Sequence, residues 1–257
     1  SSNSTIRTVE ITGATRFEKI DLTSYFNDKV TNIFKHEYLS PRPTSPTLQL
    51  PTQGIGNWAY PLVTADIDDS GLRKLAGPGN SVKYSEYISF ATPSDGTLNN
   101  ITFTSQWDNF PRSVTVPLSG KASQVYLLMA GSTNPMQSRI ANGRVTVKYT
   151  DGAADTLDLV NPDNWWPIEQ DYYIDGFAFT AGYEIPDRLY LKEGKFGKQA
   201  ASYTAIRGFT NRAIDGGAAT VLDIVLNKTK TLKSLTVETI ANDVIVGLMA
   251  LTLVREQ

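Results

Sequence analysis

The sequence has 257 residues, of which 40 % are hydrophobic, and a formal net charge of −2 from 24 basic and 26 acidic residues. This length and apolar content suffice for a sizeable core, and the near-neutral charge argues against binding to nucleic acid or to an anionic membrane surface. Because there is no cysteine and only one histidine, disulfides, thiolate chemistry and metal sites built on several histidines are excluded.

No apolar run is long enough for a transmembrane helix, and no signal peptide is recognisable. The opening Ser1-Ser2-Asn3-Ser4 looks like a trimmed start, so we expect a piece of a larger protein. We expect residues 1–257 to form a single β-sandwich domain. The alternative is an N-terminal extension, residues 1–79, packed on a core sandwich of residues 80–257, because a Gly- and Pro-rich segment lies where the two would meet.

Near the N-terminus, helical spacing of apolar residues predicts one short helix over residues 26–38. Elsewhere apolar and polar residues alternate, which predicts strands with one buried face. The expected strands cover residues 5–11, 82–90, 101–104, 113–118, 125–130, 144–149, 156–160, 188–191, 203–207, 220–226, 232–239 and 244–254. Asp151-Gly152 is a tight-turn signal and predicts a hairpin. Short strands separated by turns predict an all-β fold, an antiparallel jelly-roll β-sandwich.

A family resemblance is carried by residues 112–166, which contain R-S-V-T-V-P-L, then G-R-V-T-V-K-Y-T-D-G, then L-D-L-V-N-P-D-N-W-W. This stretch resembles the galactose-binding-like sandwiches of bacterial glycoside hydrolases. The whole chain from about residue 17 is similar to the C-terminal region of uncharacterised glycoside-hydrolase-like proteins of gut Bacteroidota. The resemblance implies an accessory module of polysaccharide utilisation. Its partners would be a glycan or polysaccharide and an attached catalytic domain, and its location periplasmic, secreted or at the cell surface.

The loop over residues 161–175 combines aromatic, acidic and amide side chains, as a sugar site requires. The candidates for stacking on sugar rings are Trp165, Trp166, Tyr172 and Tyr173, and those for hydrogen bonds to sugar hydroxyls are Asp163, Asn164 and Glu169. The alternative is that the tryptophans plug the end of the sandwich, with their indole N–H groups bonded to loop carbonyls. Trp107, at another strand end, is a further candidate ligand contact; there the alternative is a plain turn.

Acidic residues raise two other interpretations. Glu169, Asp171 and Asp175 offer a carboxylate pair of the kind that glycoside hydrolysis uses. Asp66, Asp68 and Asp69 are candidate ligands for Ca²⁺, although their spacing is not that of an EF-hand, and the alternative is a solvated acidic turn.

No motif marks a catalytic residue, so the sequence favours a non-catalytic carbohydrate-binding or bracing module. The alternatives are a glycoside hydrolase or lyase that uses carboxylates in residues 169–175, and a purely structural surface protein. No cofactor is predicted with certainty, and calcium is the one candidate. His36, in F-K-H-E-Y, is either a base or ligand or else a packing residue.

Overall fold

The computed structural model describes residues 15–36, 66–106, 109–133, 138–172, 184–201, 203–204, 213–242 and 244–256. Within these residues it contains one α-helix, α1 (Ser70–Ala76), and one turn of 3₁₀ helix, η1 (Val30–Asn32). The strands are β1 (Thr15–Lys19), β2 (Ser81–Lys83), β3 (Ser89–Ala91), β4 (Thr102–Ser105), β5 (Ser113–Pro117), β6 (Gln124–Thr133), β7 (Ala141–Tyr149), β8 (Ala154–Val160), β9 (Arg188–Tyr190), β10 (Lys195–Gly197), β11 (Tyr203–Thr204), β12 (Ala213–Ile214), β13 (Ala218–Val225), β14 (Leu232–Thr239) and β15 (Val244–Glu256).

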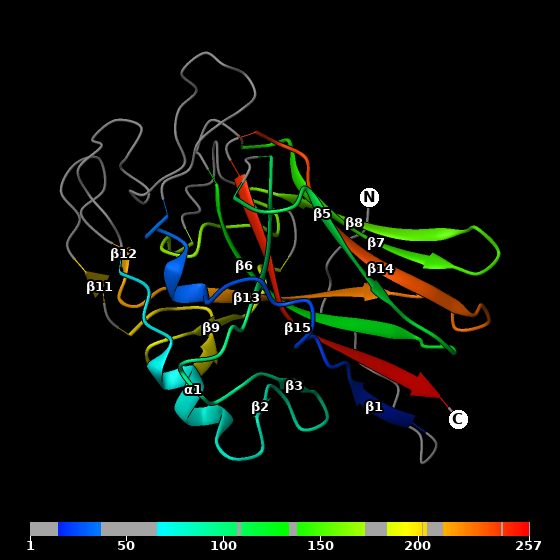
Figure 1. Ribbon diagram of the computed structural model, residues 1–257, viewed down its shortest axis with the longest axis horizontal. Helices are drawn as coiled ribbons and strands as arrows, with labels where there is room; N and C mark the ends of the chain where they lie inside the picture. Colours follow the sequence, from blue (N-terminus) through cyan, green and yellow to red (C-terminus); the bar gives the residue numbers. More distant parts are fainter. Residues whose placement is uncertain are drawn as a thin grey trace.

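Two antiparallel sheets make up the sandwich (Figure 1). The larger has the order β1-β15-β6-β13-β9-β10, and the smaller has the order β5-β14-β7-β8. Strand β15 is paired on both sides within the larger sheet: with β6 along one edge, and with β4 and then β1 along the other. The predicted all-β sandwich of jelly-roll type with one short helix is therefore confirmed.

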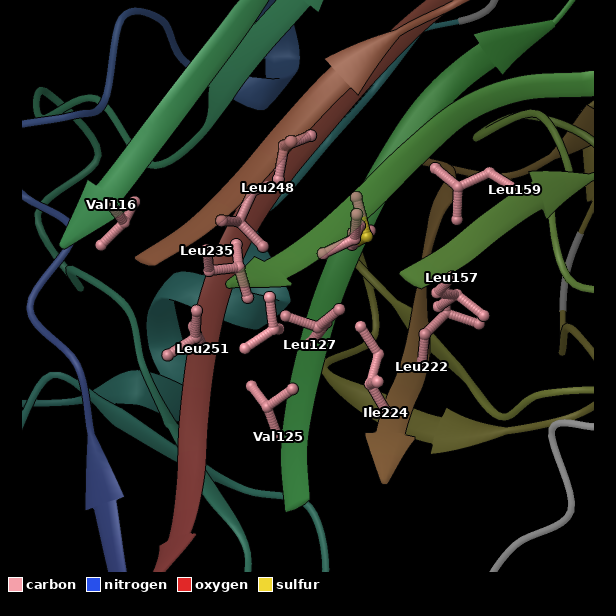
Figure 2. Packing of buried hydrophobic residues seen from close by; sticks show 14 of the residues in the cluster. Val116, Val125, Leu127, Leu157, Leu159, Leu222, Ile224, Leu235, Leu248 and Leu251 are labelled. Carbon is pink, nitrogen blue, oxygen red and sulfur yellow. The ribbon is translucent and has the colours of Figure 1, made fainter. Parts of the chain in front are cut away.

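The main hydrophobic core lies between the two sheets, as Figure 2 shows. Leu127 of β6, Leu222 of β13 and Leu251 of β15 point from the larger sheet toward Leu235 of β14 and Leu157 of β8 in the smaller one. All five side chains are buried. Burial on this scale, at roughly 25 cal/mol for each Å² of apolar surface, is the dominant favourable contribution to folding.

A second core covers the opposite face of the larger sheet. Leu128, which alternates with Leu127 along β6, packs there with Ile33 after η1, Leu72 of α1 and Phe90 of β3. Both faces of β6 are thus covered, which explains why its sequence is a continuous apolar run rather than an alternating one. The N-terminal segment, α1 and the β2–β3 hairpin provide that second cover.

The helix prediction was wrong in its position. Residues 26–36 contain only the single turn η1, and residues 37 and 38 lie outside the described part of the chain. Asp28 forms a β-bridge with Ile101, and Lys29 has an extended backbone. Pairing with a distant segment has therefore overridden the local helical spacing, although the apolar residues responsible for that spacing are buried as expected.

The predicted hairpin is confirmed as β7 and β8, joined by a turn in which Gly152 has a φ of 89°. The strand expected over residues 82–90 is instead two short strands, β2 and β3, that pair with each other. The strand expected over residues 5–11 lies outside the described residues.

Candidate functional site

Both tryptophans of the 161–175 loop are buried. Trp165 is 0 % exposed and Trp166 is 2 % exposed. The indole N–H of Trp165 donates to Thr133 Oγ1 at 2.8 Å, and that of Trp166 donates to the Pro162 carbonyl at 3.0 Å. Stacking on a sugar needs an accessible ring face, which neither indole offers in this conformation. The structure therefore favours the plug interpretation over a stacking platform for Trp165 and Trp166.

The polar residues of this loop are engaged in holding it together. Asn164 Oδ1 accepts the Val160 backbone N–H, and its Nδ2 donates to the Asp158 carbonyl. Asp163 is half-buried, and this burial raises the pKa of its carboxyl, partly offset by the charge of Arg139. Asn164 is thus a turn residue rather than a free sugar contact, while Asp163 keeps some access to solvent.

Glu169 lies too deep to meet a ligand from solvent. It is 1 % exposed, and its Oε2 has no hydrogen-bond partner among the described residues. Burial raises the pKa of this carboxyl to about 7, although its own backbone amide and the charge of Arg188 act in the opposite direction. The nearby Arg188 guanidinium donates instead to backbone carbonyls, those of Pro167 and Ala218 among them.

Of the remaining candidates in this region, only two are described. Tyr172 donates its hydroxyl to the Pro186 carbonyl at 2.7 Å and packs edge-on against Trp166. Asp171 accepts the Tyr172 backbone N–H. Tyr173, Asp175 and Trp107 lie outside the described residues.

Two of the three carboxylates in the acidic segment before α1 accept hydrogen bonds from within the protein. Asp68 Oδ1 accepts the Ser70 backbone N–H, and Oδ2 of Asp69, the residue just before α1, accepts from Arg73 and Asn100. Asp66 is exposed. In the described part of the chain, no three His, Cys, Asp or Glu side chains gather closely enough to bind a metal ion. The calcium prediction therefore gains no support from these carboxylates, whose hydrogen bonds are those of an acidic turn before a helix.

His36 is hydrogen-bonded rather than standing alone. Its Nε2 lies 2.5 Å from Asp28 Oδ2, and its ring packs edge-on against Phe110. Asp28 is 7 % exposed and also accepts from the Lys29 backbone N–H and from Asn32. These contacts support the packing interpretation of the histidine.

A hollow of about 560 Å³ lies between β1 and β3, with Lys19 of β1 and Ala91 of β3 among its lining residues. We call it the β1–β3 hollow. It is lined by Lys19, Asp21, Leu22, Thr23, Phe26, Gly79, Asn80, Ala91, Thr92, Pro93, Leu98 and Asn99. Volumes of this order are typical of small-molecule sites.

The lining of the β1–β3 hollow is mixed in character. Leu22, Phe26 and Leu98 provide apolar surface, and Leu98 is 50 % exposed. The amides of Asn80 and Asn99 provide polar groups beside it, although Asn80 Oδ1 already accepts from the backbone N–H and the hydroxyl of Ser94. Such a combination of apolar surface with a few convergent polar groups characterises ligand sites.

Thr92, in the wall of the hollow, has a buried hydroxyl without a partner in the described part of the chain. It lines the hollow and is 2 % exposed, yet its Oγ1 has no hydrogen-bond partner within the described residues. A buried hydroxyl without a partner costs about 1–3 kcal/mol. Solvent does not reach this oxygen, so a ligand in the hollow would pair with it only after a small movement of the wall, and the pairing would then recover that free energy.

A buried network holds the walls of the hollow in place. The Arg73 guanidinium donates to the carbonyls of Pro93, Asp95 and Leu98 and to the Asp69 carboxylate, at distances of 2.7–3.1 Å. It thereby fixes the loop that carries Pro93 and Leu98.

Asn100 extends this network to the opposite wall. Its Nδ2 donates to Asp69 Oδ2, and its Oδ1 accepts the Val30 backbone N–H, both at 2.9 Å. Val30 begins η1, which follows the wall residues Leu22 and Phe26 along the chain. The two walls are therefore joined through one set of buried side chains.

Sequence reasoning missed this site because its residues come from two segments separated by more than fifty positions, 19–26 and 79–99. Neither segment carries a spacing that chemistry requires. The local signal in the sequence was the Gly-Pro-Gly-Asn turn at residues 77–80, in which the structure gives Asn80 a left-handed backbone (φ 50°).

Comparison with known proteins adds no assignment: no family model matches the sequence, and no curated protein matches it. In the part of the chain that the structure describes, no helix has both the length and the apolar character needed to cross a membrane.

Proposed function

We propose that the protein is a non-catalytic carbohydrate-binding module of a larger glycan-degrading protein and that its glycan binds in the β1–β3 hollow. The observation that carries the proposal is the β1–β3 hollow itself, which combines apolar surface with side-chain amides and has Thr92, with its buried, unpartnered hydroxyl, in its wall. Sugar rings present apolar C–H faces and a rim of hydroxyls. Leu22, Phe26 and Leu98 suit the former, and Thr92 with the two asparagines suits the latter.

The hollow also has the rigidity that weak hydroxyl contacts need. Arg73 and Asn100 fix its walls by hydrogen bonds to backbone groups. A site that is already ordered loses less conformational entropy when a ligand binds. By contrast, Glu169 is buried, so a carboxylate pair that included it would not reach a glycosidic bond. This argues against a catalytic pair that includes Glu169; a pair of Asp171 and Asp175 would include a residue outside the described part of the chain.

The test is isothermal titration calorimetry of wild-type protein and Thr92→Val against a panel of oligosaccharides, with released reducing sugar assayed in the same samples. Valine keeps the shape of threonine and removes the unpartnered hydroxyl. We expect glycan affinity to fall about three- to tenfold, the value of one hydrogen bond. We expect stability to stay the same or to rise, since no internal hydrogen bond is lost.

Thr102→Val is the matched control. Thr102 of β4 is also 2 % exposed with an unpartnered Oγ1 in the described region, but it does not line the hollow. Its replacement should leave glycan affinity unchanged. Equal effects of the two substitutions on affinity would argue against the hollow. The absence of binding by any glycan to folded protein would overturn the proposal, and release of reducing sugar would favour the hydrolase.

A further inference from the structure

Two of the residues that line the β1–β3 hollow are charged, and their charges are opposite. Lys19 is the last residue of β1, and Asp21 follows two positions later. The structure shows no ion pair between them: Lys19 Nζ donates to Ser81 Oγ at 3.1 Å, and Asp21 Oδ1 accepts from the backbone N–H and the hydroxyl of Thr23. Each charge therefore remains open to a ligand.

The carboxylate of Asp21 is held in its ionised form. The two hydrogen bonds from Thr23, at 2.6 and 2.9 Å, lower the pKa of the Asp21 carboxyl below its ordinary value. Asp21 Oδ2 has no partner within the described residues. It can accept a hydroxyl hydrogen, while Lys19 Nζ, with three hydrogens, can donate to a hydroxyl or ring oxygen. Hydrogen bonds in which one partner is charged are the stronger kind.

From this balance of charges we propose that the hollow, as the glycan site proposed above, selects uncharged hexose units and discriminates against uronic acids and amino sugars. A neutral hydroxyl gains from both Lys19 and Asp21. A sugar carboxylate would pair with Lys19 but be repelled by Asp21, and a sugar ammonium would experience the reverse. In either case the desolvation of the ligand's charge is not repaid by a site whose own charges cancel. Repulsion of the wrong ligand is a common basis of specificity.

The experiment compares three series of trisaccharides of the same linkage: neutral hexoses, the matching hexuronates, in which a carboxylate replaces the hydroxymethyl group, and the matching hexosamines, in which an ammonium replaces one hydroxyl. Calorimetry at about 0.15 M salt, where the Debye length is about 8 Å, is performed on wild type, Asp21→Asn and Lys19→Met. We expect the wild type to bind the neutral series best. Asp21→Asn should improve hexuronate affinity about threefold to fivefold, and Lys19→Met should improve hexosamine affinity by a similar factor.

Lys83→Met is the control for a change of net charge. Lys83 lies on β2 and is exposed, but it does not line the hollow. Its substitution should leave all three affinities unchanged. Thermal unfolding of each variant checks that Lys19→Met, which also loses the hydrogen bond to Ser81, is folded.

The outcomes separate this inference from the function on which it rests. Binding of neutral and charged series with equal affinity, unchanged by Asp21→Asn and Lys19→Met, would overturn the selectivity but leave glycan binding intact. An effect of Lys83→Met equal to that of Lys19→Met would also overturn it, since a general electrostatic field would then be responsible. No binding of any series to folded wild type and variants would overturn both.

Discussion

Replacing Arg73 with methionine should destabilise the protein strongly, because Arg73 is a buried cation at the centre of the network behind the β1–β3 hollow. Its side chain is 7 % exposed, and its Nε lies 2.9 Å from Asp69 Oδ2, whose side chain is 11 % exposed. Methionine fills much of the same volume but leaves the Asp69 carboxylate with Asn100 as its remaining side-chain donor. It also removes the hydrogen bonds to three loop carbonyls.

Breaking a buried ion pair by removing one partner costs about 3–5 kcal/mol. Arg144→Met is a matched control, since Arg144 and Asp158 also form an arginine–aspartate pair, at 2.6 Å, but their side chains are 39 % and 45 % exposed. Exposed pairs contribute about 0–1 kcal/mol. Urea denaturation of both variants gives the two values. Adding Asp69→Asn to Arg73→Met should recover part of the loss, because it removes the unpaired buried charge.

Equal destabilisation by Arg73→Met and Arg144→Met would refute the reasoning, since it would mean that burial does not increase the importance of the Arg73 pair. If Arg73→Met does not fold, Arg73→Lys provides the measurement. Lysine keeps the charge but lacks the planar fork that reaches several carbonyls at once. It should show an intermediate loss of stability, together with weaker glycan binding because the wall with Leu98 is less fixed.

Three further predictions concern other parts of the fold. Glu169 binds its proton more tightly in the folded state, with a pKa of about 7 against an ordinary value of 4.5. Because the unfolded state then binds fewer protons between these two pH values, the free energy of unfolding should fall by about 3 kcal/mol as pH rises through them. Glu169→Gln should remove this dependence when denaturation midpoints are compared at pH 5 and pH 8, and an unchanged difference would contradict the prediction. Tyr84→Phe should lower the free energy of unfolding by about 1–2 kcal/mol in urea denaturation, because the Tyr84 hydroxyl donates to Asp187 Oδ2 at 2.6 Å. Tyr87→Phe, at an exposed position, is the control and should produce no measurable change in the same assay. Gly131→Ala should lower the free energy of unfolding by about 3 kcal/mol or more, since a Cβ there would lie 2.0 Å from the Ile245 carbonyl oxygen and 2.6 Å from Trp165 Cζ2. Gly96→Ala, with open space around it, is the control and should leave the thermal unfolding midpoint unchanged.

Strands could be predicted from the sequence where the order of apolar and polar residues follows from which faces of the sheet are covered. The Asp151-Gly152 turn signal correctly predicted the β7–β8 hairpin, and the apolar run from Val125 to Ala130 correctly predicted β6, whose two faces are both covered. Helices were not predictable in this way. Helix α1 is seven residues long and includes Gly71, where a Cβ would lie 2.2 Å from the Lys192 carbonyl oxygen. Its position depends on close contact with a distant turn, which the local sequence S-G-L-R-K-L-A does not express.

The aromatic loop shows why composition alone cannot separate a binding site from a plug. Both need large rings for contact area, and both need acceptors near the indole N–H groups, so both select tryptophan beside asparagine, aspartate and proline. What decides between them here is on another strand. Gly131 of β6 provides the space that Trp165 fills, and Thr133 of the same strand accepts its indole hydrogen. A larger residue at position 131 would not fit between Ile245 and the indole ring, and Trp165 would have to move. The role of the loop is therefore determined by a glycine and a threonine about thirty residues earlier in the chain, neither of which is unusual in its own local sequence.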